Sequence, residues 1–139
     1  MVGQGGEIKL TIPGQARTPQ TGQVTVIREG VTATGKKYRN AKLFPGKLYR
    51  QYKKAALQFI ACAKIPSTVK LPLTVLIRVT PVWYHKDKRR RDEDNLKKGL
   101  GDILKSSRLI IDDHIIRWGE CGHFIDKDNP LTEVVITEA

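Results

Sequence analysis

The residues in this sequence that could carry out chemistry are concentrated between Lys86 and Asp113. The run from Lys86 to Arg91 is basic except for one aspartate, and Asp92-Glu93-Asp94-Asn95 follows it directly. A second acidic pair, Asp112-Asp113, comes after a helix-like run. Such cations bind a polyanion, and carboxylates hold a hard divalent metal ion against its phosphates. The pattern therefore predicts a metal-dependent nuclease.

Asp92 and Asp94 stand where a helix is expected to begin, and an aspartate there commonly caps the helix. Two features favour a metal site instead. The neighbouring cations would draw a phosphate backbone to this point, and the second acidic pair returns to the same end of the sheet after one helix. Neighbours on an extended backbone point to opposite faces, so either Asp112 or Asp113 is expected to be a ligand and the other a turn or capping residue.

Lys98 lies four residues after Asp94, on the same face of the expected helix. It could form a surface ion pair with Asp94, worth about 0.3–0.5 kcal/mol. It could equally act on the scissile phosphate as charge develops in the transition state. Both interpretations stay open from the sequence. Asp102, one turn further on, is either a supporting group for that site or a residue of the polar helix face.

The overall charge supports the polyanion part of this hypothesis. Lys and Arg number 25 against 14 Asp and Glu, giving a net charge of +11 in 139 residues. An excess of this size is typical of a nucleic-acid-binding protein, although a ribosomal-type protein or a protein bound to acidic lipid would give the same sum. No apolar run approaches the roughly 20 residues of a spanning helix, and the N-terminus lacks a signal-peptide pattern.

Two cysteines, Cys62 and Cys121, are too few for a disulfide scaffold, so a cytoplasmic location is expected. The sequence around Cys121-Gly122-His123 does not provide a tetrahedral zinc site, since the chain has only these two cysteines and three scattered histidines. Asp126 to Asn129 resembles the start of a calcium loop but lacks the later glycine and glutamate, so it is read as a turn.

The elements that must position these residues begin with a strand from Glu7 to Ile12, which alternates and stops at Pro13-Gly14. Two short β-prone runs, Gln23 to Arg28 and Val31 to Thr34, predict a hairpin with its turn at Glu29-Gly30. A basic, aromatic loop from Gly35 to Arg39 is expected to follow.

A helix is predicted from Lys47 to Lys64, opened by Pro45-Gly46 and stopped by Pro66. Its expected apolar stripe is Leu48, Tyr52, Ala55, Phe59 and Cys62. Four cations outside this stripe form either a solvated face or a DNA contact surface: Lys47, Arg50, Lys53 and Lys54. The alternating run from Leu71 to Thr80 predicts a central strand with Leu71, Leu73, Val75, Ile77 and Val79 inward.

From Asp92 onward the apolar residues Leu96, Leu100, Ile103 and Leu104 recur at helical spacing. Gly99 and Gly101 weaken such a helix, which predicts close packing against another backbone. The remaining predicted elements are a strand in His114 to Cys121, a turn from Asp126 to Pro130 and a last strand from Leu131 to Thr137. The fold class is thus α+β (α/β-like), with residues 1–139 as a single domain in which two main helices pack on a small mixed sheet.

The run from Arg89 to Lys98, followed by Asp102-Ile103-Leu104 and Ile111-Asp112-Asp113, resembles the core of the RusA family. This family comprises small Holliday-junction resolvases of bacteria and phages. Ile8 to Gly14 is similar to the family's opening strand, and the helix from Lys47 sits where the family has one. The sequence departs from the family at His114-Ile115, where many members carry a small residue and then Gln, and Thr18 to Lys37 is hard to match.

The resemblance implies that Asp92, Asp94 and Asp113 are metal-binding aspartates and that Lys98 is a catalytic lysine. It also implies a RusA-like fold, Mg²⁺ as cofactor with Mn²⁺ as a possible substitute, a homodimer, and symmetrical cleavage of a four-way DNA junction. The residues expected to bind DNA are Lys88, Arg89, Arg90, Arg91 and Lys97.

The sequence therefore predicts a homodimeric, Mg²⁺-dependent endonuclease that resolves Holliday junctions in recombination and repair, with no membrane partner. Hydrolysis would proceed by in-line attack of a metal-activated water on a phosphodiester. One alternative is a non-catalytic basic nucleic-acid-binding protein whose aspartates are caps and ion-pair partners. Another is a nuclease of the same fold that acts on flaps or replication forks.

Overall fold

The central sheet of this computed structural model has five strands and mixed directions. The structure describes residues 7–19, 24–44 and 46–139, so Gln23 and Pro45 of the predicted elements lie outside it. In sheet order, β1 (Ile8–Pro13), β7 (Leu131–Glu138) and β4 (Ile77–His85) are antiparallel neighbours. The free edge of β4 then pairs in parallel with β5 (Ile116–Trp118) and, further along, with β6 (Gly122–Ile125).

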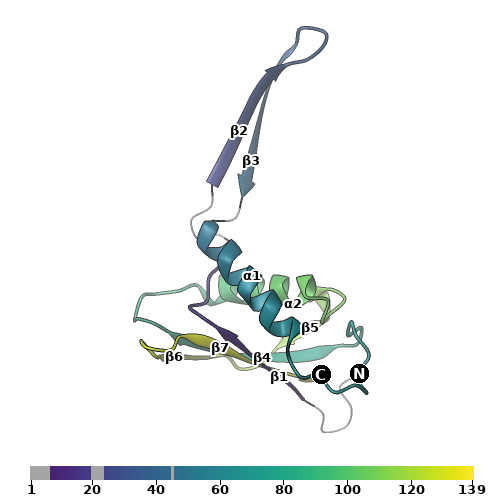
Figure 1. The fold of residues 1–139 in the computed structure, drawn as a ribbon, viewed down its shortest axis with the longest axis vertical. Coiled ribbons are helices and arrows are strands. Elements are labelled where there is room, and N and C mark those ends of the chain that lie inside the picture. The colour runs from purple at the N-terminus through teal and green to yellow at the C-terminus, as the bar shows by residue number, and fades with distance from the viewer. Residues whose placement is uncertain (1–6, 20–23, 45) are drawn as a thin grey trace.

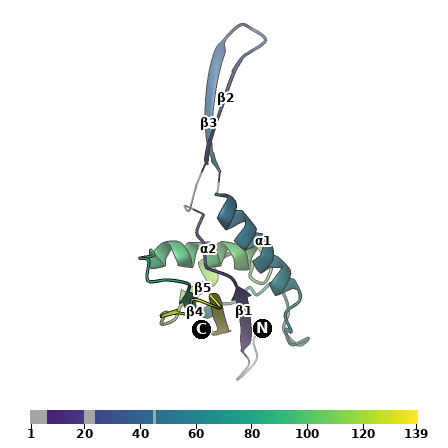
Figure 2. The same cartoon turned by 60° about the vertical axis from the view of Figure 1, so that its left-hand side comes forward.

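Two helices, α1 (Lys47–Ala61) and α2 (Glu93–Ser106), lie on the same side of this sheet (Figures 1 and 2). The hydrophobic core lies between the sheet and the two helices. It is formed by one face of the strands and the apolar stripe of α2. In β1, residues alternate between buried and exposed as the sequence predicts. The predicted stripe of α2 is also confirmed, because its four apolar residues are all buried: Leu96, Leu100, Ile103 and Leu104. The α+β class with a mixed sheet and two helices is therefore confirmed.

A two-stranded hairpin of β2 (Val24–Val31) and β3 (Lys37–Phe44) projects away from this body (Figures 1 and 2). The prediction of a hairpin is confirmed, but the predicted turn position is wrong. Gly30 lies within the ladder opposite Tyr38, whose side chain covers it. The turn instead spans Thr32 to Lys36, where Gly35 adopts φ +83°, and most of the expected loop is strand β3.

The predicted apolar stripe of α1 is also wrong in register, although one of its five members, Tyr52, does pack against the core. The buried residues of this helix are Tyr49, Ala56 and Ile60, whereas Leu48 and Phe59 are about half exposed. Both sets recur at helical spacing, so periodicity alone does not choose between them. The choice is made by Tyr49, whose hydroxyl donates a 2.6 Å hydrogen bond to Asp102 on α2. The helix also ends three residues before the predicted Lys64.

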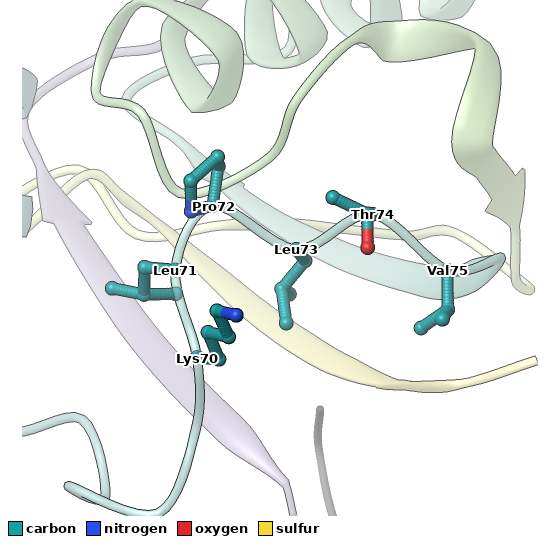
Figure 3. Close-up of a pocket in the computed structure, with 6 residues that line it drawn as sticks. All are labelled: Lys70, Leu71, Pro72, Leu73, Thr74 and Val75. Atoms are coloured by element: carbon teal, nitrogen blue, oxygen red, sulfur yellow. The ribbon is translucent and has the colours of Figure 1, made fainter.

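The central strand starts later than predicted and runs on through Pro81 to His85. Leu71 and Val75 are exposed, because Leu73 pairs with the chain after α2: its N–H donates to Leu109 and its carbonyl accepts from Ile111. Pro81 is tolerated in β4 because it falls between the stretches paired with β5 and β6. Figure 3 shows the segment from Lys70 to Val75, which lines a cavity of about 270 Å³.

After α2 the chain forms a 3-10 helix, η1 (Asp113–Ile115), before β5 begins. The predicted strand from His114 to Cys121 is therefore wrong at both ends: only β5 lies within it, and the next strand, β6, begins after it at Gly122. The close packing expected at Gly99 is confirmed, since a Cβ there would lie 3.3 Å from the carbonyl oxygen of Arg17. In the described residues, neither helix combines the length and the apolar character needed to cross a membrane.

Candidate active site

Asp92 is the N-cap of α2 and shapes the first turn of the helix. Its Oδ1 accepts a hydrogen bond of 3.0 Å from the backbone N–H of Asp94 and a longer one of 3.5 Å from that of Asn95. The Asn95 side chain donates to Oδ2 at 3.4 Å. Such a cap satisfies N–H groups that the helix leaves free. The carboxylate of Asp92 thus has a structural task in the described fold.

Asp94 lies in the first turn of α2 and faces a cavity of about 280 Å³. The cavity brings together residues from three elements that are adjacent in space: α2, η1 and β5. Its lining residues are Asp94, Lys97, Lys98, Gly101, Asp113, Ile116 and Trp118. Asp94, Lys98 and Asp113, predicted from separate parts of the sequence to act together, therefore share one cavity, while Asp92 does not line it.

Asp113 lies on η1, which packs against α2 at Gly101. A Cβ at Gly101 would lie 3.7 Å from the Cβ of Asp113, which is ordinary van der Waals contact, so a larger side chain would compete with the aspartate for space. The glycine is buried in the helix. It costs helix stability of about 1 kcal/mol relative to alanine.

The neighbouring Asp112 faces a different set of partners. It caps η1 by accepting a hydrogen bond of 2.7 Å from the backbone N–H of Asp113. Lys105 Nζ lies 3.3 Å from Oδ1 of Asp112, and His114 Nδ1 lies 3.4 Å from Oδ2. The Asp113 N–H, with help from Lys105, lowers the pKa of Asp112 to about 2. The geometry gives Asp112 the capping position and Asp113 the position in the cavity.

Lys98 does not form the surface ion pair that its spacing from Asp94 allows. In the described residues, the ion pair between positions four apart at the start of α2 is formed instead by Lys97 and Glu93. Lys97 Nζ lies 3.4 Å from Glu93 Oε2. Lys97 also lies 6.0 Å from the centre of the Trp118 ring. Lys98 is exposed at the cavity with no carboxylate within 4.0 Å in the described part of the chain. An ammonium in this position is available to an anion that enters the cavity.

The donor chemistry of the cavity suits a hard divalent cation, because Asp94 and Asp113 both offer carboxylate oxygens. Within residues 7–19, 24–44 and 46–139, however, no three Asp, Glu, His or Cys side chains lie close enough together to form a ready metal site. The hydrogen bonds of Asp92 to the helix N-terminus explain why the third predicted aspartate does not join the other two. Two of the three predicted aspartates thus share the cavity, and their oxygens are of the type that such a cation takes.

A chain of four hydrogen-bonded side chains behind the first turn of α2 was missed from the sequence. Gln15 Nε2 lies 3.1 Å from His85 Nδ1, and His85 Nε2 lies 3.0 Å from His123 Nδ1. His123 Nε2 then lies 2.8 Å from a carboxylate oxygen of Glu93. These residues come from the segment after β1, from β4, β6 and α2, and no spacing in the sequence connects them.

The direction of donation along this row of hydrogen bonds is set by its first residue, Gln15. Gln15 Oε1 accepts a hydrogen bond of 2.7 Å from the backbone N–H of Lys86, so the amide nitrogen faces His85 and donates to Nδ1. His85 must then donate from Nε2 to His123, which in turn donates from Nε2 to Glu93. Burial, followed by the charges of Arg91 and His123, lowers the pKa of His85 to about 4. The hydrogen bond from His123 lowers the pKa of Glu93.

The basic run before α2 borders a second cavity, of about 340 Å³, beside the two histidines. Arg91 is committed to this loop, because it binds the Asp87 carboxylate and the Arg89 carbonyl, each at 2.9 Å, and its side chain is only 14% exposed. The predicted DNA contacts Lys88, Arg89 and Arg90 are exposed. Phe124 and Ile125 on β6 are half exposed at the same cavity.

Asp102 lies outside the Asp94–Asp113 cavity and joins the two helices instead. It accepts hydrogen bonds from the Tyr49 hydroxyl at 2.6 Å and from Lys53 Nζ at 2.8 Å. Burial raises its pKa, but the hydrogen bonds from Lys53 and Tyr49 outweigh this effect, and the net pKa is lowered. Lys53 is thus paired, while Lys47, Arg50 and Lys54, the other cations of α1, are exposed.

Comparison with known proteins gives one family. The model of the family described as endodeoxyribonuclease RusA matches residues 18–137. The match includes both cavities, the hairpin and α1, and it begins after β1, the strand compared with the family's opening strand. No curated protein matches the chain.

Proposed function

The chain belongs to the RusA endodeoxyribonuclease family, and on this premise we propose that it is a metal-dependent nuclease that resolves four-way DNA junctions. The observation that carries the proposal is the cavity shared by Asp94, Lys98 and Asp113. Two carboxylates stand beside an ammonium that has no carboxylate within 4.0 Å in the described residues. On a protein of net charge +11, they form a site where phosphate and a divalent cation would both be held.

In this proposal Asp94 and Asp113 hold Mg²⁺, or Mn²⁺ in its place. Asp92 completes the set by turning its carboxylate from the helix N-terminus toward the cavity, which sacrifices a cap worth about 1 kcal/mol. The bound cation would supply an activated water and stabilise charge on the phosphate oxygens. Asn95, whose side chain contacts Asp92, would remain as a polar neighbour at the start of α2.

The protein's own groups orient the substrate. Lys98 would contact a non-bridging oxygen of the scissile phosphate, where its charge has the greatest effect as negative charge develops. The exposed cations Lys88, Arg89 and Arg90, just before α2, would hold the adjacent phosphates of the strand. Arg91 and Lys97 would act more indirectly, because Arg91 stabilises the loop through Asp87 and Lys97 pairs with Glu93.

We also propose a homodimer, because a four-way junction offers two symmetry-related strands and a twofold dimer presents two equivalent sites to them. The outward face of α1 supports this proposal. Leu48, Ala55 and Phe59 are spaced by seven and four residues there, and all three are exposed in the single chain. This spacing is typical of a helix that packs against another helix. Sedimentation equilibrium of the wild-type chain and of Phe59→Asp would test the assignment, since the variant should sediment as a monomer.

The function is tested by incubating purified protein with a synthetic four-way junction and with a linear duplex of the same sequence, each with and without Mg²⁺. Cleavage of the junction alone, dependent on Mg²⁺ and absent in Asp94→Asn, is the expected result. Binding without cleavage at every Mg²⁺ and Mn²⁺ concentration would instead identify a nucleic-acid-binding protein. Faster cleavage of a flap or a forked substrate than of the junction would change the proposed substrate but would still support a nuclease.

A further inference from the structure

The hairpin β2–β3 is an isolated projection of the fold. Figures 1 and 2 show it extending from the N-terminal end of α1, away from the sheet, in both views. Among the described elements, β2 and β3 share their extensive contacts only with each other. An isolated two-stranded hairpin is at best marginally stable in water. A chain that maintains such a hairpin outside its core is expected to use it for binding.

The charge of the hairpin indicates what it binds. Between Val24 and Phe44 the sequence has five basic residues against one acidic residue, Glu29. The basic residues are Arg28, Lys36, Lys37, Arg39 and Lys42. Arg39 pairs with Glu29 at 3.4 Å, with both side chains about two-thirds exposed. Arg28, Lys36 and Lys37 are exposed and have no carboxylate within 4.0 Å in the described chain. The hairpin therefore presents unpaired positive charge.

Exposed apolar side chains lie among these cations. Ile27 is 48% exposed, Val31 is 62% exposed and Tyr38 is 45% exposed. Val31 and Tyr38 also line a hollow of about 590 Å³ on the outer half of the hairpin, together with Lys37 and Arg39. Cations next to apolar and aromatic groups suit a partner that offers phosphates and base edges side by side. An acidic protein surface would use the cations but leave these apolar groups exposed.

The dimensions also fit duplex DNA. A two-stranded ribbon has strands about 4.8 Å apart, and eight residues at about 3.4 Å each give it a reach of about 27 Å. The major groove of B-DNA is about 12 Å wide and admits a ribbon of this kind. The hairpin is therefore narrow enough to enter the groove, and its length carries its turn away from the sheet (Figure 1).

We propose that β2–β3 is a DNA-binding arm that enters the major groove of a duplex next to the point of cleavage. The arm rests on the proposed function, because it assumes that the substrate is branched DNA with duplex on more than one side. Arg28, Lys36 and Lys37 contact phosphates along the groove edges, and the outer part of the arm, with Val31 and Tyr38, faces the bases.

Salt dependence of binding tests the charge contacts with a matched pair of variants. Lys36→Ala/Lys37→Ala removes two lysines from the arm, and Lys64→Ala/Lys70→Ala removes two exposed lysines from the segment after α1. The arm variant should lower the slope of log K against log salt by about 1.8, since each phosphate contact contributes about 0.9. The control should change the slope by less than half as much. Equal changes in the two variants would overturn the proposal.

A photo-crosslinking residue at Val31 identifies the partner directly. With p-benzoylphenylalanine at Val31, irradiation in the presence of a four-way junction should give an adduct with DNA, whereas the same residue at Val75 should not. An adduct with a second copy of the chain, and none with DNA, would overturn the proposal.

Cleavage by the labelled protein separates this proposal from the proposed function. Cleavage without a DNA adduct would contradict the proposal for the arm and support the proposed nuclease activity. A DNA adduct with no cleavage by the wild-type chain would support the arm as a DNA-binding element and contradict the proposed nuclease activity.

Discussion

His123 donates a hydrogen bond to Glu93 at 2.8 Å, and Glu93 stands between the two aspartates at the start of α2. The imidazole stacks on the buried ring of Trp83, with ring centres 5.0 Å apart, and is held from behind by His85. This contact joins the first turn of the helix to strands β4 and β6. We therefore expect His123 to act as a positioning residue for the acidic turn.

Replacing His123 tests this role. His123→Ala should slow single-turnover cleavage of a bound junction by about tenfold, because a small displacement of the acidic turn misplaces Asp94. Junction binding should be almost unchanged. His123→Gln should recover most of the rate, since its amide can still donate to Glu93. A His123→Ala rate equal to wild type, with normal thermal stability, would show that the contact has no part in positioning.

The two aspartates of the cavity should be essential for cleavage. Asp94→Asn and Asp113→Asn should each lower the single-turnover rate by about 10³ or more, because metal-ion stabilisation of the transition state is worth several kcal/mol. Junction affinity should stay the same or rise, since a carboxylate near phosphates is repulsive. Mn²⁺ binding followed by electron paramagnetic resonance gives a readout independent of activity. Asp112→Asn is the matched control, and a greater loss there than in Asp113→Asn would exchange their roles.

Asp92→Asn separates capping from metal binding. Asparagine caps a helix about as well as aspartate, so the free energy of unfolding should change by no more than a few tenths of a kcal/mol. A large loss of cleavage in this stable variant would make Asp92 a third ligand. Wild-type cleavage would leave Asp92 as a cap alone.

Lys98→Ala should reduce the single-turnover rate by about 10²–10³, with binding almost preserved, if its ammonium acts on the phosphate. Lys98→Arg should recover only part of this loss, because a guanidinium places its charge differently. Lys97→Ala is the neighbouring control and should mainly weaken the ion pair with Glu93. Near-normal rates for Lys98→Ala would remove the lysine from the reaction.

The pKa of His85, lowered by burial to about 4 from its ordinary value of 6.5, predicts a pH dependence of stability. Between these values the unfolded chain binds a proton that the folded protein does not, so the free energy of unfolding falls as pH decreases from about 6.5 to about 4. Above pH 6.5 this group has no effect. Urea unfolding of wild type and His85→Gln should show a shallower pH dependence for the variant in this window. Identical curves would contradict the assignment.

Asp102 should matter for stability and little for catalysis. Asp102→Ala leaves the Tyr49 hydroxyl, on a side chain only 2% exposed, without its acceptor, which should cost about 1–3 kcal/mol of unfolding free energy. Tyr49→Phe removes the donating hydroxyl itself, so no buried donor is left without an acceptor. This variant should therefore lose less unfolding free energy than Asp102→Ala. The cleavage rate of Asp102→Ala, measured below its unfolding transition, should match wild type. A selective loss of rate would place Asp102 at the active site.

Local patterns in the sequence were sufficient where one element decides the outcome. The alternation of β1 and the stripe of α2 both follow from residues a few positions apart. The cavity could also be anticipated, because a helix followed by a short return brings Asp113 back to the start of the same element. What the sequence could not show is the exact partner of each group.

The errors arise where two distant segments decide the structure. In α1, Tyr49 is buried because Asp102 on the other helix accepts its hydroxyl, and nothing in the helix itself distinguishes that register. Leu73 leaves the predicted strand because it pairs with the chain after α2. The link from His85 to His123 spans 38 residues and joins two strands, so no local period reveals it.

The separation of the hairpin from the core has a consequence for how this protein can change over evolution. Because β2 and β3 have their extensive contacts with each other, substitutions at Ile27 or Val31 do not disturb the packing around Trp83 and Leu100. Selection can therefore act on the hairpin without affecting the cavity of Asp94 and Asp113. Homologues with the same body are expected to differ most in this segment, and grafting their hairpins onto this chain should yield folded proteins with altered DNA preference.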